Sequence, residues 1–138
     1  MNDCERFEQL IEGGDCCISI VTNEEHDALE IVRKTAEKLK RDMWVWSVAD
    51  GVRDGLLDGS PASANTDHPA AGLANLAQAK PGSLCVTLDL AEHLKGGKAL
   101  RILRDMIDSF DSSGLTIIMI DSSDKLPDIH FLVEDQQA

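Results

Sequence analysis

Residues 16–48, CCISIVTNEEHDALEIVRKTAEKLKRDMWVWSV, decide the fold. The short apolar, β-branched run over 16–22 indicates a buried strand. Apolar residues then recur at helical spacing over about 24–41, which predicts an amphipathic helix. A second apolar strand is expected over 43–48. Strands that are apolar on both faces and joined by a helix are typical of a parallel sheet covered on both sides.

The same alternation of strands and helices continues outward from this unit. Pro69 suits the first turn of a helix, and Pro81-Gly82 stops it. The further elements expected are helices over 69–80 and 98–110 and strands over 83–90, 115–120 and 130–133. We therefore predict an α/β fold, a three-layer α/β/α sandwich around a mainly parallel five-stranded sheet.

The chain has 138 residues, enough for one domain at roughly 150 residues per domain. We expect an N-terminal helix or lead-in over 1–14, a single α/β domain over 15–135 and a tail over 136–138. Glycine, proline and small polar residues gather over about 50–67. That composition predicts a flexible surface loop within the domain.

The charge limits what the surface can bind. Twenty-five acidic residues against 13 basic ones give a net charge of −12. Such a surface repels nucleic acids and anionic membranes, so neither is expected as a partner. No apolar run approaches the ~20 residues that span a bilayer, and the N-terminus lacks a signal-peptide pattern. We therefore expect a cytoplasmic protein. No cysteine or histidine spacing resembles a metal site.

Ligands of open parallel sheets bind where the strands end, so residues that follow a strand are the candidate site residues. Thr22, Asn23, Glu24 and Glu25 follow the first strand and fit a capping box, with Thr22 as the N-cap. A P-loop would need glycines, a lysine and a hydroxyl there, and no G-x-x-x-x-G-K-[ST] motif occurs. Carboxylates at the helix start would repel a triphosphate. No cofactor is therefore expected for this chain.

Two aspartates end later strands. Asp89 follows LCVTL in the manner of a Walker B strand, and Asp121 follows LTIIMI. Either acid could hold Mg²⁺, but any buried strand ending in aspartate gives the same pattern, and a residue that caps a loop explains it equally well. No G-x-S-x-G motif or placed histidine marks a nucleophile, so no catalytic residue is singled out.

The most specific string in the chain is VWSVADGVRDG, residues 45–55. Together with the strand that ends in TNEE, the helix RILRDMIDSF and the strand TIIMIDSS, it resembles the N-terminal region of a group of AAA-type ATPases that includes plastid-encoded members. The likeness covers about residues 15–134. The resemblance implies a degenerate P-loop, RecA-like domain without a Walker A motif, placed ahead of the true AAA module.

A domain of this kind would be a non-catalytic regulatory or interaction domain. Its partners would be its own C-terminal ATPase module, neighbouring subunits or a client protein, and ATP and Mg²⁺ would serve only the full-length protein. The chain ends where that module is expected to begin. The interaction candidates carried over are Trp46, Gly51, Arg53, Asp54 and Gly55, with Arg53 and Asp54 as an exposed charged pair. In the alternative interpretation Trp46 is core, the glycines form turns, and the two charges pair locally.

Two other functions fit the same residues. A receiver-like signalling domain would use Glu24 and Glu25 as its acid pair, Asp89 as the phosphorylated residue and Ser122 after the fourth strand. Its lysine should lie near the end of the fifth strand, whereas Lys125 precedes that strand. A small metal-dependent enzyme would instead use the acidic strand ends to hold a divalent ion.

Overall fold

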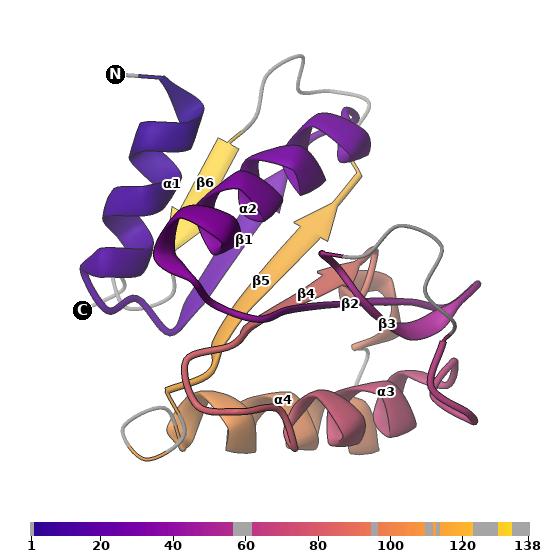
Figure 1. The fold of residues 1–138 in the computed structure, drawn as a ribbon. Coiled ribbons are helices and arrows are strands. Elements are labelled where there is room, and N and C mark those ends of the chain that lie inside the picture. Colours follow the sequence, from indigo (N-terminus) through magenta and orange to yellow (C-terminus); the bar gives the residue numbers. More distant parts are fainter. Residues whose placement is uncertain are drawn as a thin grey trace.

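Figure 1 shows the fold as a computed structural model that describes residues 2–56, 62–94, 97–109, 112, 114–122 and 130–133. The elements in chain order are α1 (Asp3–Glu12), β1 (Cys17–Val21), α2 (Glu25–Leu39), β2 (Met43–Ser47), β3 (Gly51–Asp54), α3 (Pro69–Leu76), β4 (Leu84–Leu88), the 3₁₀ turn η1 (Ala91–His93), α4 (Lys98–Asp108), β5 (Thr116–Asp121) and β6 (His130–Val133). None of the helices in these ranges is long and apolar enough to cross a membrane.

The strands form one mixed sheet in the order β3-β2-β4-β5-β1-β6. The four central strands are parallel, and β3 and β6 pair antiparallel at the two edges. The α/β fold and the mainly parallel sheet are thus confirmed. The predicted count of five strands is wrong, because Gly51–Asp54 pairs with β2 as a sixth strand. Gly51 has φ +76°, a conformation that glycine supplies readily and that permits the tight hairpin.

The helices lie on both faces of the sheet because the chain reverses its direction of travel across the strands. From β1 it passes over β5 and β4 to reach β2, and then returns by way of β4 to β5. Right-handed crossovers in opposite directions place their helices on opposite faces. Figure 1 shows this arrangement, with α2 over one face beside α1, and α3 and α4 beneath the other.

Each face of the sheet has its own apolar core. Ile118 packs with Phe7 and Val32 under α1 and α2, whereas its neighbour Ile117 packs with Leu73 and Leu103 against α3 and α4. Successive residues of a strand point to opposite faces, so both sets are buried. This double burial explains why the central strands have continuous apolar runs rather than alternating ones.

The segment over 50–67, predicted as a flexible loop, is clamped to the sheet in its described parts. The backbone N–H of Ser63 donates to the Val52 carbonyl, and the Val52 N–H donates to Thr66 Oγ1, both at 2.8 Å. Trp46 Nε1 donates to the Thr66 carbonyl at 2.7 Å. Both outward backbone groups of Val52 are therefore occupied by the chain itself, which blocks strand addition at that point of the edge. Residues 57–61 lie outside the described residues.

The tightest packing in this region is between Trp46 and Gly72. The indole is 1% exposed, and α3 crosses it at Gly72, where a Cβ would overlap Nε1. Only glycine permits the helix to lie so close to the indole while Trp46 keeps its bond to Thr66. A Gly72→Ala substitution should therefore destabilise the domain by ~1–3 kcal/mol through overpacking, although alanine favours helix.

Denaturant unfolding of the wild type and the Gly72→Ala variant measures this cost. Ala74→Ser, at an exposed position of the same helix, is the control and should change the free energy of unfolding by less than about 0.5 kcal/mol. The cost should shrink in a Trp46→Phe background, because the ring that the methyl meets is smaller. Strict additivity of the two substitutions would show that Trp46 is not what opposes the methyl group.

Candidate functional site

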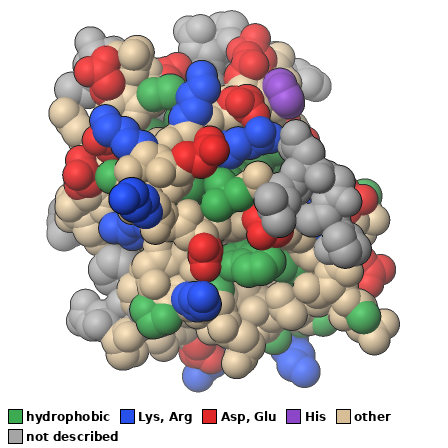
Figure 2. Space-filling view, in the orientation of Figure 1, with side chains coloured by type: hydrophobic (Ala, Val, Ile, Leu, Met, Phe, Trp, Pro, Cys, Tyr) green, Lys and Arg blue, Asp and Glu red, His purple; other side chains and the backbone are tan. Residues whose placement is uncertain are grey.

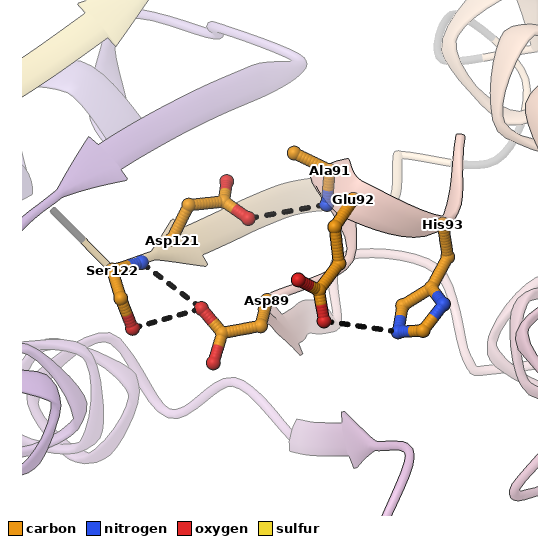
Figure 3. Close-up of polar contacts among 6 residues, drawn as sticks. All are labelled: Asp89, Ala91, Glu92, His93, Asp121 and Ser122. Atoms are coloured by element: carbon orange, nitrogen blue, oxygen red, sulfur yellow. Dashed lines mark hydrogen bonds and ion pairs between the residues drawn. The ribbon is translucent and has the colours of Figure 1, made fainter. Parts of the chain in front are cut away.

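A crevice opens at the carboxyl ends of the parallel strands. The chain leaves β1 towards α2 on one face and leaves β4 towards η1 and α4 on the other, and such a divergence creates a cleft at the sheet edge. The described residues that line it enclose about 440 Å³ and are Asp89, Ala91, Glu92, Asp121 and Ser122. Figure 3 shows these side chains gathered from the ends of β4 and β5 and from η1. We call this space the acidic cleft.

Asp89 ties the ends of β4 and β5 together. Its Oδ1 accepts hydrogen bonds from the backbone N–H and from the Oγ of Ser122, both at 2.9 Å. Its own N–H donates to the Ile120 carbonyl at 2.8 Å. Asp89 also adopts φ +53°, a left-handed conformation that aspartate tolerates better than most residues. The side chain therefore has a structural role in joining the two strand ends.

Asp121 makes the second link across the cleft. Its Oδ1 accepts from the Ala91 N–H at 3.1 Å, so that the end of β5 holds the first residue of η1. Burial raises the pKa of Asp121, the bond from Ala91 opposes this shift, and the charges of Asp89 and Glu92 add to it. The cleft therefore holds its acids at an electrostatic cost.

The residues after β1 lie at the same edge of the sheet, but they do not form the predicted capping box. Thr22 is buried, and its Oγ1 accepts from the Glu24 N–H at 3.0 Å, two residues on rather than three. Glu24 is the N-cap residue of α2 and makes no side-chain cap. The capping-box prediction is wrong because the helix begins after a local hydroxyl turn. Glu25 lies in the first helical turn; burial, and then the charge of Asp89, raise its pKa.

The described ionisable side chains at this edge of the sheet are acidic. Glu25, Asp89, Glu92 and Asp121 bring four carboxyl groups to it, and none of the described lining residues is basic. Such a field repels phosphate groups. Among the described residues, no group of three or more His, Cys, Asp or Glu side chains is placed to hold a metal ion.

The sheet order corrects the receiver interpretation. Receiver domains have the flavodoxin-like strand order 2-1-3-4-5, in which the first strand lies between the second and third. Here β1 lies between β5 and β6. Asp89 and Ser122 do meet, as that hypothesis requires, but they meet as a hydrogen-bonded link between neighbouring strands. Lys125 lies outside the described residues.

The interaction candidates carried over from the resemblance lie apart from the acidic cleft, on the β2–β3 hairpin. Trp46 belongs to the core, as the alternative interpretation proposed. Gly51 forms the turn and abuts Thr66, and Gly55 leaves room for the Met43 side chain. These three candidates therefore shape the hairpin.

The two charges of the hairpin do not form the pair predicted between them. Arg53 Nη2 lies 3.5 Å from Asp50 Oδ2, whereas Asp54 Oδ1 accepts from the Leu56 N–H at 2.8 Å. Adjacent strand residues point to opposite faces, which keeps Arg53 and Asp54 apart. The Arg53 side chain is 39% exposed, so it is half-buried rather than fully exposed.

The turn η1 supplies residues that sequence reasoning missed. Ala91 and Glu92 line the acidic cleft, and His93 meets the Trp46 ring edge-on, with centroids 6.1 Å apart. The sequence could have indicated these residues only by their position, because they follow within a few residues the end of β4, at the edge where a site was expected. η1 thus joins the cleft to the hydrophobic core under the hairpin.

An Asp121→Asn substitution should stabilise the domain at neutral pH. The folded state raises the pKa of Asp121, so it holds the proton more tightly than the unfolded state and loses stability as pH rises through that window. The amide removes the charge and can still accept from Ala91. The Tm gain expected at pH 7 should disappear in acid, below the pKa values of both states.

Thermal unfolding of the two proteins at neutral and acidic pH provides the comparison. Asp67→Asn, at an exposed aspartate, is the matched control and should leave Tm nearly unchanged. A Tm gain for Asp121→Asn that is equal at both pH values would rule out charge as its cause.

The sequence model of a protein family, described as the SpoVK-like AAA ATPase N-terminal domain, matches residues 4–132 of the chain. No curated protein and no solved structure matches the chain. The matched segment runs from α1 into β6 and contains both the acidic cleft and the β2–β3 hairpin. The resemblance seen in the motifs is thereby confirmed: the chain belongs to the family of SpoVK-like AAA ATPase N-terminal domains.

Proposed function

We propose that this chain is a non-catalytic regulatory or interaction domain of an AAA ATPase. Family membership supports this role. The complete protein would bind ATP and Mg²⁺ and hydrolyse ATP through a separate C-terminal module, and this chain would need no cofactor. Its partners would be that module, neighbouring subunits or a client protein. The net charge of −12 argues against nucleic acid and anionic membrane as partners.

The observation that carries the proposal is the position of carboxylates where a nucleotide would need positive charge. In a P-loop, phosphates lie on the N-terminus of the helix after a strand, and Mg²⁺ lies between a loop hydroxyl and an acid from another strand. Here Glu24 and Glu25 begin that helix. The charge of Asp89, from another strand, reaches Glu25. This supports a P-loop-like, RecA-like domain that has lost its Walker A function.

The groups that could serve Mg²⁺ already have structural partners. The Thr22 hydroxyl accepts from the Glu24 N–H, and Asp89 Oδ1 accepts twice from Ser122. Ligating a metal would require rearranging these bonds. We therefore treat the strand ends as structural, with Asp89 and Asp121 as links between elements.

Contact with a partner is assigned to the β2–β3 hairpin. Val48, in its turn, is 53% exposed, and Arg53 presents a half-exposed guanidinium that forms an ion pair with Asp50 at 3.5 Å. Figure 1 places the turn of this hairpin at the margin of the fold, beyond the helices. A rigid hairpin with an accessible arginine and an apolar side chain has the composition of a protein contact.

The chain alone should not bind Mg·ATP with a Kd below about 1 mM, because its carboxylates repel the phosphates. Isothermal titration of this chain with Mg·ATP measures binding, and the full-length protein is the positive control. Saturable binding to the chain alone, weakened by an Asp89→Asn substitution, would overturn the degenerate-site assignment.

In the full-length protein, Arg53→Ala should alter assembly or ATPase rate while the domain keeps its fold. The exposed ion pair with Asp50 contributes only about 0–1 kcal/mol, so stability should change little. Arg101→Ala is a matched control, since Arg101 makes a similar exposed ion pair, with Asp105 at 3.6 Å, but on α4. If Arg53→Ala and Arg101→Ala leave assembly and ATPase rate equally unaffected, the hairpin is not the contact.

A further inference from the structure

The two tryptophans of β2 differ in how their indole nitrogens are satisfied. They lie two positions apart in the strand, so both side chains face α3 and α4. Trp46 is 1% exposed, and its Nε1 donates to the Thr66 carbonyl. The Nε1 of Trp44 is also buried, but it has no hydrogen-bond partner among the described residues. Because an indole N–H can only donate, Trp44 holds a donor that lacks an acceptor.

Trp44 lines a small pocket at the end of α3. The pocket measures about 170 Å³, and its described lining residues are Trp44, Ser63, Asn75, Leu76, Gln78 and Ala79. None of these six side chains is charged, and none of them lines the acidic cleft. We call this space the Trp44 pocket. It is a second site, and its chemistry differs from that of the acidic cleft.

The size and the lining of the Trp44 pocket restrict its ligand. Sites for cofactors and drug-sized ligands measure ~300–1,000 Å³, so this pocket holds only a smaller group. Leu76 and Ala79 supply apolar surface, whereas one hydroxyl and two amide side chains supply uncharged hydrogen-bonding groups. One neutral, apolar amino-acid residue with its peptide carbonyl fits this combination.

The unmet N–H gives the pocket a preference for a carbonyl. A buried donor without an acceptor destabilises the folded chain, and a ligand that supplies the acceptor recovers that loss. Ser63 and Gln78 are exposed, so an incoming carbonyl reaches Nε1 when these side chains turn aside. Rotamer changes of this kind are common at binding surfaces.

The rest of the surface favours a contact anchored at one residue. On the face shown in Figure 2, hydrophobic side chains form separate patches between charged and polar ones rather than one broad apolar face. A partner therefore gains most by placing a single side chain in a pocket. Tryptophan is among the residues that most often dominate the binding energy of such contacts.

We propose that the Trp44 pocket binds a neutral, apolar residue of a partner polypeptide, with Trp44 Nε1–H donating to a peptide carbonyl of that partner. The inference rests on the proposed interaction role and names the group that the partner supplies. It is distinct from the contact assigned to Arg53, which lies opposite Val45, a residue of the core under α2. Since directly opposite residues share a face, the two contacts lie on opposite faces of the β2–β3 hairpin.

Nuclear magnetic resonance of the two indole N–H signals tests the pocket. N-acetyl-leucine-N′-methylamide supplies one neutral, apolar side chain between two peptide carbonyls. Titration of this chain with that compound should shift the Trp44 signal downfield in a saturable way, with a Kd of about 1 mM for a ligand of this size. The Trp46 signal should stay in place, because its N–H is already bonded to Thr66. Trp44→Phe removes one of the two signals and thereby assigns both.

Substitutions identify the groups that bind. Trp44→Phe should weaken binding roughly three- to tenfold, followed through the backbone amide signals of the pocket, because phenylalanine keeps an aromatic ring but has no N–H. Gln78→Ala should also raise the Kd, since it removes an amide from the lining. Gln9→Ala, at an exposed glutamine of α1, is the matched control and should leave the Kd unchanged.

Three results would overturn the proposal: no shift at about 10 mM compound, roughly ten times the expected Kd; equal shifts of both indole signals; or equal Kd values for the wild type and Trp44→Phe. Should Trp44→Phe fail to fold by circular dichroism, the comparison of Gln78→Ala with Gln9→Ala decides. The titration needs neither ATP nor the full-length protein. Its failure would therefore remove the pocket alone, and the Arg53→Ala comparison would still decide the proposed function.

Discussion

The single right-handed crossover from β1 to β2 is the constraint on which the rest of the fold depends. By passing over β5 and β4 it sends α2 to one face and obliges the two returning connections to place α3 and α4 on the other. The divergence of these connections opens the crevice at the carboxyl edge. It also brings the residues after β1, β4 and β5 together, although they are about 30 to 100 positions apart in the sequence.

The charges of the acidic cleft determine which ligands it can accept. A helix N-terminus at a sheet edge is favourable for an anion, and an intramolecular carboxylate can take that place as well as a phosphate can. Glu25 lies in the first turn of α2, and its pKa and that of Asp121 are raised first by burial and then by neighbouring carboxylates, Asp89 among them. The hydrogen bonds from Ser122 and Ala91 compensate by binding the strand ends together. The edge thus combines a crevice at the strand ends with carboxylates that repel anions.

Strand and helix positions could be predicted because each element is buried by a periodic apolar pattern, and the candidate acids could be predicted because strands end at one edge. β3 could not be predicted, because Gly51–Asp54 is only four residues long, includes two charged residues and has no strand pattern in the sequence. Its outer edge is stabilised by hydrogen bonds between Val52 and the distant residues Ser63 and Thr66. η1 was missed for a related reason, since its role comes from contacts with Asp121 and Trp46, which are distant in sequence. The prediction that Arg53 pairs with Asp54 was also wrong. The two residues are adjacent in sequence, but neighbouring side chains of a strand point to opposite faces, and Arg53 pairs with Asp50 instead.

Trp46 links the parts that these constraints create. Its indole N–H secures the segment that completes β3, its ring fills the space left by Gly72, and its edge contact with His93 reaches the cleft wall. The hydrogen bond from the indole fixes the position of Thr66, and close packing at Gly72 fixes the position of α3. The aromatic contact with His93 fixes the position of η1. The hairpin that carries Arg53 and the cleft that carries Asp89 are therefore separate surfaces that share one buried side chain. Movement of the indole would therefore affect both the wall of the acidic cleft and the β2–β3 hairpin.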